Sequence, residues 1–246
     1  MRSKILFPII LLLASQLANA QEKPALNKTD RIRLAETFRL ADQLSERVWR
    51  DWTKAPFAVL LVTPDYEFLM RHPSPSADFL PLGFDPLLKS NVYYRKRTFS
   101  TTLLATFPAV NGSMVSTIVV GQAEQTAVKT STPWVVVLLH EHFHQLQYSQ
   151  PNYYPDVTAL DLAGGDHTGM WMLNFAFPYE RKEVQDSFSR LSVMLVDTVR
   201  APQSELKRKT SNYLKEREEF GRMLSEKEFR YFNFQFWQEG IARYTE

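Results

Sequence analysis

The pattern of apolar and polar residues changes half-way along the chain, from short apolar runs to longer segments with helical spacing. The short runs are typical of β-strands and lie at residues 58–62, 66–70, 92–99, 103–107 and 114–120. Thr63-Pro64-Asp65 separates the first two runs, and Asn111-Gly112 separates the last two, so each of these pairs is expected to be joined by a turn. The pattern predicts a small, mostly antiparallel sheet.

Helical spacing predicts five longer elements, at residues 30–52, 134–148, 184–199, 204–224 and 226–244. Thr132 and Pro133 are typical of a helix start, and Ser225 with Glu228 forms a capping box. The segment 72–86 holds four prolines and is expected to be a loop. The fold class is therefore α+β, with a small N-terminal sheet followed by a helical lobe.

The first twenty residues resemble a secretory signal peptide. Arg2 and Lys4 precede a short apolar run, residues 5–13, and Ala18-Asn19-Ala20 is a small-residue cleavage pattern. We expect cleavage after Ala20 and export to the periplasm or the extracellular space, with a retained anchor as the alternative. The run is too short to span a bilayer, so no stable membrane span is expected after signal removal.

The remaining chain is expected to form one catalytic domain with two lobes. Residues 21–131 form the N-terminal helix and β-sheet lobe, and residues 132–246 form the helical metal-binding lobe. The metal site is expected between the two lobes. No helix-ending signal precedes Glu246, so the sequence is also compatible with a fragment that is truncated at its C-terminus.

Charge and cysteine content limit the partners and the kinds of site. Arg2 and Lys4 are two of the 29 basic residues, so the chain after Ala20 has as many basic residues as its 27 acidic ones. We therefore expect no nucleic-acid partner. There is no cysteine, so any metal must be bound by His, Asp or Glu.

One short motif carries the strongest indication of chemistry. His140 and His144 are four residues apart, so a helix places both imidazoles on one face, where they can bind one divalent ion. Glu141 follows the first ligand and is the expected general base toward a metal-activated water. His142 points to the other side of the helix and is expected to pack in the core. The alternative is a histidine pair without a metal.

A catalytic zinc site normally has three protein ligands. The best third candidate is Glu239, within Trp237-Gln238-Glu239-Gly240-Ile241-Ala242. His-Glu-x-x-His followed by a helical Trp-x-Glu-Gly-x-Ala resembles the gluzincin superfamily of zinc peptidases. This resemblance implies one zinc ion on His140, His144 and Glu239, with Glu141 as general base, and close helix packing at the small residues. The long gap between His144 and Glu239 departs from the aminopeptidase branch.

Several other residues are weaker candidates. Asp166 and His167 follow Gly164-Gly165; His167 could replace Glu239 as a ligand or stabilise an oxyanion, and both could instead support the ligands or lie in a loop without a role. Tyr244 or Tyr179 could donate a hydrogen bond to the oxyanion. Arg243 could pair with Glu239 or bind a substrate terminus, and His72 is expected to be exposed. By analogy with gluzincins, the strand at residues 114–120 is a candidate for holding extended peptide, with an interior position as the alternative.

These features predict an exported, zinc-dependent hydrolase that acts on a peptide or protein substrate. The alternative is a non-catalytic binding module that retains a gluzincin-like fold. An exported zinc carrier is less consistent with the sequence, because it has no His-rich tract.

Overall fold

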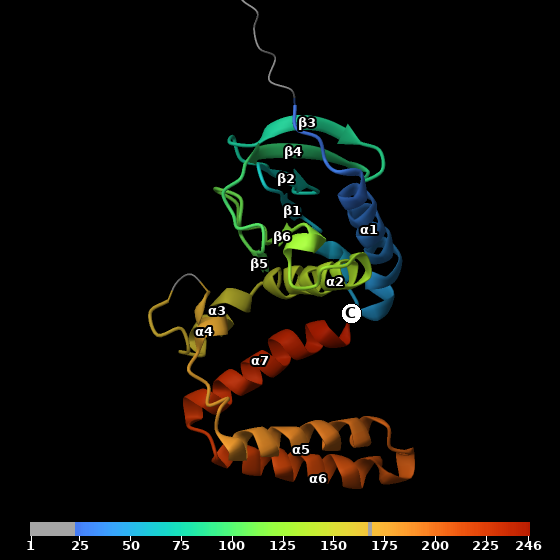
Figure 1. Cartoon of the computed structure of the whole chain (residues 1–246). Helices are drawn as coiled ribbons and strands as arrows, with labels where there is room; N and C mark the ends of the chain where they lie inside the picture. The colour runs from blue at the N-terminus through green and yellow to red at the C-terminus, as the bar shows by residue number, and fades with distance from the viewer. Residues whose placement is uncertain (1–22, 167–168) are drawn as a thin grey trace, which may run out of the picture.

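The computed structural model describes residues 23–166 and 169–246, which form an α+β fold (Figure 1). Within these residues there are seven α-helices and one six-stranded mixed sheet. The fold class predicted from the sequence is confirmed. The predicted signal peptide and His167 lie outside the described residues.

The sheet supplies the frame on which the candidate site is built. Its strands are β1 (Val59–Val62), β2 (Tyr66–Met70), β3 (Leu80–Asp85), β4 (Ser90–Lys96), β5 (Leu104–Phe107) and β6 (Thr117–Gly121). Their order is β3-β4-β2-β1-β6-β5, and only β1 and β6 pair in parallel. The sheet is therefore mostly antiparallel, with β3 and β5 at its edges.

Two helices cover one face of the sheet. Helix α1 (Lys28–Val48) and helix α2 (Ser131–Tyr148) pack on it through Leu34, Phe38, Trp134 and Leu138, which are almost fully buried. Loop residues, including Phe79 and Val110, cover the opposite face. Strand β1 is buried along its whole length because both faces of the sheet are covered.

The structure corrects three details of the sequence interpretation. Strand β3 lies within the segment expected to be a loop, because an edge strand tolerates Pro81, next to which the register shifts. The predicted first helix ends at Val48 rather than 52, and its side chains Leu44 and Val48 are exposed. Strand β6 lies between β1 and β5, so the candidate peptide-binding strand at 114–120 is interior. The edge of the sheet on this side is formed by β5.

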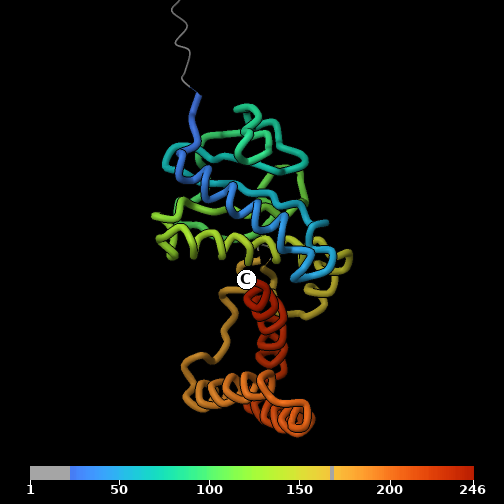
Figure 2. The backbone as a smooth tube through the Cα atoms, turned by 90° about the vertical axis from the view of Figure 1, so that its right-hand side faces the viewer, coloured from blue at the N-terminus to red at the C-terminus, as the bar shows by residue number. Residues whose placement is uncertain are grey.

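The second half of the chain is helical. It contains α3 (Tyr153–Ala159), α4 (Trp171–Asn174), α5 (Lys182–Val199), α6 (Gln203–Arg222) and α7 (Glu226–Tyr244). Helices α5 and α6 form a hairpin, and α7 runs from this hairpin back to α2, as Figures 1 and 2 show. The predicted capping box, Ser225 with Glu228, is present at the start of α7. None of the described helices is both long and apolar enough to cross a membrane.

Candidate metal centre

Helix α2 is held rigidly against the sheet. The indole Nε1 of Trp134 donates to the backbone oxygen of Gly121 (3.0 Å), and Gln145 Nε2 donates to the backbone oxygens of Ala58 (2.9 Å) and Ser116 (2.7 Å). Gly121 must be glycine, since a Cβ there would lie 1.7 Å from the backbone oxygen of Thr101. These contacts fix which face of α2 points away from the sheet, toward α7.

His140, His144 and Glu239 come together between α2 and α7. The Nε2 atoms of the two histidines lie 3.0 Å apart. Glu239 Oε2 lies 3.3 Å from His140 Nε2 and 3.5 Å from His144 Nε2. Both imidazoles are buried, whereas the Glu239 side chain is 53% exposed, so the group is reached from solvent on the Glu239 side.

This donor set fits a divalent ion. Ligand atoms 2.0 to 2.2 Å from a tetrahedral zinc ion lie roughly 3.3 to 3.6 Å from one another. The three observed distances are close to this range, and the candidate ligand atoms all lie within 4.8 Å of one another. Two imidazole nitrogens and one carboxylate oxygen are also a donor set that zinc accepts. The three residues predicted as ligands are therefore brought together with the spacing that one ion requires.

Mutual electrostatic effects link Glu239 to the histidines. Burial raises the pKa of Glu239, but the hydrogen bonds with His140 and His144 and the charges of these two histidines together lower it by more, so its pKa lies well below the ordinary value. Burial lowers the pKa of His144, but the hydrogen bond with Glu239 and the charges of Glu141 and Glu239 raise it by more. The ionised carboxylate that a cation requires is thus the favoured form of Glu239.

Glu141 is buried and connected to the edge strand. Thr106 on β5 donates through Oγ1 to Glu141 Oε2 (2.7 Å) and lies 3.2 Å from the Glu141 backbone oxygen. Among the described residues, no hydrogen bond engages Oε1. One carboxylate oxygen of Glu141 is therefore held by Thr106, and the other has no hydrogen-bond partner among the described residues.

The outer nitrogens of both histidines also have oxygen neighbours. Glu246 Oε1 lies 2.9 Å from His140 Nδ1, at ion-pair distance but without hydrogen-bond geometry, and Arg243 contacts Glu246 (2.8 Å). From the sequence, Arg243 was a possible partner of Glu239. In the structure its ion-pair partner is Glu246. Gln147 Oε1 lies 2.7 Å from His144 Nδ1. Neither Glu246 nor Gln147 was predicted from the sequence, although Gln147 follows His144 by three residues, a spacing that brings two side chains together on one helix.

Two further histidines lie within the described residues, His142 and His72, and both are buried. His142 is buried as expected, stacks on Phe57 with ring centroids 3.9 Å apart, and contacts Gln145 through Nδ1 (3.0 Å). Its pKa is lowered to about 4 by burial. The expectation that His72 is exposed is wrong: it is 7% exposed, and its Nδ1 accepts from the backbone nitrogen of Ser74 (3.1 Å).

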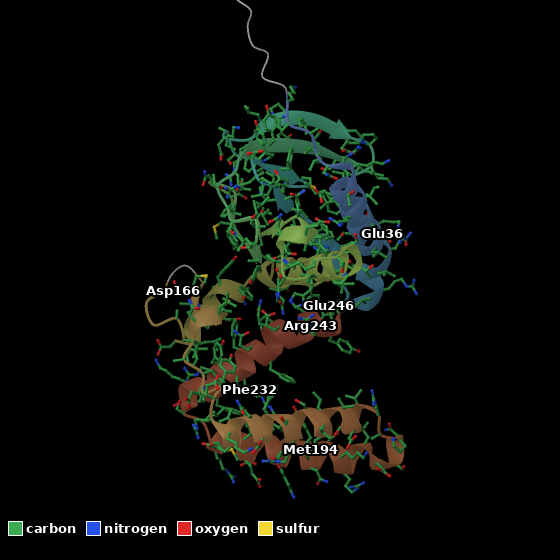
Figure 3. The ribbon with its side chains drawn as sticks, viewed as in Figure 1. Glu36, Asp166, Met194, Phe232, Arg243 and Glu246 are labelled. Carbon is green, nitrogen blue, oxygen red and sulfur yellow. The ribbon has the colours of Figure 1, made fainter. Side chains whose placement is uncertain are left out.

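The weaker candidates lie apart from the three ligands or project into solvent. Asp166 accepts from the backbone nitrogen of Trp171 (2.6 Å), and Figure 3 shows it beside α3 and α4, away from Glu246 and Arg243. Tyr244 is 84% exposed and Tyr179 is also exposed. A different tyrosine faces the site: burial raises the pKa of Tyr148, and the charges of Glu141 and Glu239 add to this effect. Tyr148 lies one helical turn after His144, a spacing that could have selected it.

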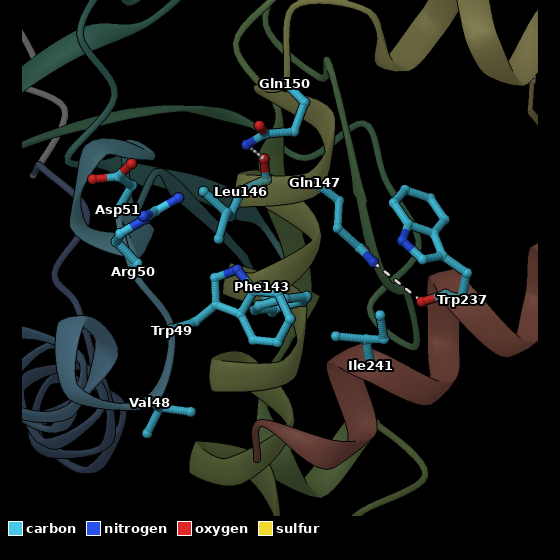
Figure 4. A pocket seen from close by; sticks show the side chains of 10 residues that line it. All are labelled: Val48, Trp49, Arg50, Asp51, Phe143, Leu146, Gln147, Gln150, Trp237 and Ile241. Atoms are coloured by element: carbon cyan, nitrogen blue, oxygen red, sulfur yellow. Dashed lines mark hydrogen bonds between the residues drawn. The ribbon is translucent and has the colours of Figure 1, made fainter.

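A separate groove of about 650 Å³ lies on the other side of Gln147 (Figure 4). Trp49 and Trp237 lie on its opposite sides, and Phe143 and Leu146 form part of its wall. None of the three candidate ligands lines it. Gln147 thus lines this groove and also contacts His144.

Comparison of the chain with known protein families, with curated proteins and with solved structures gives no match. The interpretation of this site therefore rests on its own geometry.

Proposed function

We propose that the protein is a zinc-dependent hydrolase of the peptidase type, similar in its site to the gluzincins, and that it acts after export. The observation that carries the proposal is the set of distances, 3.0, 3.3 and 3.5 Å, that joins the candidate ligand atoms of His140, His144 and Glu239. Bound zinc would supply Lewis-acid activation of a water molecule and of a carbonyl oxygen.

Glu141 would take the proton from the attacking water through Oε1. Thr106 supports this role because its hydroxyl occupies Oε2 and limits rotation of the carboxyl group. Such a base is not needed in a purely structural metal site. Its presence beside two metal-ligand histidines favours catalysis over structural binding.

The edge strand β5 is the proposed support for an extended peptide. Its outer edge has no neighbouring strand among the described residues, and Thr106 connects it to Glu141. A peptide added along this edge would form main-chain hydrogen bonds and lie next to the proposed base. It takes the place of the segment 114–120, for which the sequence had left open either this role or an interior position.

The test compares the wild-type protein with Glu141→Gln in digestion of a mixed peptide library, followed by mass spectrometry. We expect about one zinc ion per chain in both proteins, and a loss of turnover on the order of 10² to 10⁴-fold in the variant. Glu219→Gln, an exposed change on α6, is the matched control and should be fully active.

Two other outcomes would contradict the proposal in different ways. Zinc binding without hydrolysis of any peptide by the wild-type protein would favour the non-catalytic binding module. Full zinc affinity in Glu239→Ala would remove Glu239 from the ligand set and leave the proposed metal centre without its third ligand.

A further inference from the structure

Gln147 contacts His144 on the side opposite to the candidate metal position. Both residues are buried on α2, and Gln147 Oε1 lies 2.7 Å from His144 Nδ1. A neutral imidazole has one N–H and one lone pair, so Nδ1 can donate or accept here, and the choice decides the state of Nε2. The orientation of the Gln147 amide therefore matters for the ligand atom.

The backbone of α7 fixes that orientation. Gln147 Nε2 donates to the backbone oxygen of Gln238 (3.0 Å) and lies 3.5 Å from that of Trp237. A carbonyl oxygen can only accept, so the nitrogen of the Gln147 amide must face α7 and its oxygen must face His144. An amide oxygen at 2.7 Å requires Nδ1 to carry the proton.

The neighbouring Gln238 side chain adapts to this choice. In the structure its Nε2 lies 3.1 Å from His144 Nδ1, and its Oε1 accepts from the hydroxyl of Tyr153 (3.1 Å). An N–H donor at this position would need a lone pair on Nδ1, so the Nδ1–H tautomer requires the Gln238 amide to turn over by 180°. The Tyr153 hydroxyl can donate or accept, and it therefore permits this exchange of the amide oxygen and nitrogen. Gln147 is the member of the network whose orientation a backbone group determines.

We infer that Gln147 is a positioning residue that fixes the Nδ1–H tautomer of His144 and so keeps the Nε2 lone pair directed at the metal. The effect of the tautomer on metal affinity rests on the proposed function. The tautomer itself can be measured in the metal-free protein. This role of Gln147 is distinct from the contact between α2 and α7 that its Nε2 makes with the backbone oxygen of Gln238.

The test uses two substitutions that separate the two ends of the amide. Gln147→Glu keeps an oxygen acceptor for His144 and loses the donor to α7, whereas Gln147→Met loses both. Gln150→Met is the control, because Gln150 lines the same groove and, among the described residues, its side chain donates only to the backbone oxygen of Leu146 (2.9 Å). Zinc affinity is measured by competition with a chelator.

We expect Gln147→Met to weaken zinc binding by about 10 to 100-fold, with Gln147→Glu and Gln150→Met close to wild type. Equal losses in Gln147→Met and Gln147→Glu would overturn the inference, because they would assign the effect to the α2–α7 contact. No loss in Gln147→Met would also overturn it.

Imidazole ¹⁵N spectra of the metal-free wild-type protein, recorded at alkaline pH, decide the question independently of how the variants fold. A proton on Nδ1 of His144 supports the inference, and a proton on Nε2 overturns it. If the wild-type protein binds no zinc, the proposed function fails, while the spectrum still reports the tautomer.

Discussion

Glu246 Oε1 lies 2.9 Å from Nδ1 of His140, on the side of the imidazole opposite to the candidate metal position. The guanidinium of Arg243, one helical turn earlier, holds this carboxylate through contacts with both of its oxygens (2.8 and 3.0 Å). A carboxylate beside the outer nitrogen of a ligand histidine can orient the ring.

Glu246→Gln should therefore weaken zinc binding by roughly tenfold or more without unfolding the protein. Arg243→Gln should have a smaller effect in the same direction, because it leaves the carboxylate in place. Chelator competition gives both affinities, and equal affinity in Glu246→Gln and wild type would show that this carboxylate does not support the ligand.

Thr106→Val should reduce turnover while leaving zinc affinity unchanged. The substitution is nearly isosteric and removes the hydrogen bond to Glu141 Oε2. A hydrogen bond to a charged group contributes about 1.5 to 3 kcal/mol, so a reduction of kcat by about tenfold or more is expected. Thr106→Ser keeps the hydroxyl and is the control. If Thr106→Ser and Thr106→Val lose the same activity, packing rather than the hydrogen bond is responsible.

Gly240 and Ala242 should respond in opposite ways to added bulk. A Cβ at Gly240 would meet nothing within 4 Å, so Gly240→Ala should stabilise the exposed helix by about 0.5 to 1 kcal/mol. Ala242 is fully buried in the cluster with Phe143 and Leu146, so Ala242→Leu should destabilise by about 1 to 3 kcal/mol. Urea unfolding measures both. The close packing of α2 and α7 expected from the sequence thus depends on Ala242, not on Gly240.

His142 should make stability depend on pH. Its pKa falls from an ordinary 6.5 to about 4 in the folded protein because it is buried, so the unfolded chain binds the proton more tightly. Stability is then fully present above about pH 6.5 and is lost as the pH falls toward 4, by about 3 kcal/mol in total.

The measurement is the free energy of unfolding of metal-free protein at pH 7.5 and at pH 5. His142→Gln cannot be protonated in this range, so its stability should fall by about 2 kcal/mol less than that of wild type between the two values. An identical fall in both proteins would mean that other groups cause the pH dependence.

Local sequence signals predicted much of the fold. The ends of α5, α6 and α7 were predicted within two residues, because helical spacing and the Ser225–Glu228 capping box mark them directly. Strand β3 was missed because Pro81 and its neighbours indicate a loop unless the strand is known to be at an edge. Edge position is a property of the assembled sheet and has no local sequence signal.

The same distinction applies to the site. The spacing of His140 and His144 on one helix was enough to predict that their side chains lie together. Glu239 was predicted as their partner from a resemblance to the gluzincins. Thr106 and Glu246 come from other elements, and only the packing of α2 against β5 and α7 brings them to Glu141 and His140. His72 was misjudged because its surrounding prolines suggest an exposed loop, yet the side chain is buried.

The candidate ligands lie on two helices. Helix α2 packs on the sheet, and α7 follows the α5–α6 hairpin in the chain. In a chain without cysteine, an ion held by α2 and α7 would act as the cross-link between these two regions. Because the ion would bind the folded chain and not the unfolded one, it would stabilise the contact between the two regions, and their separation would depend on release of the metal. Chelation would then change how cooperatively the protein unfolds as well as whether it is active.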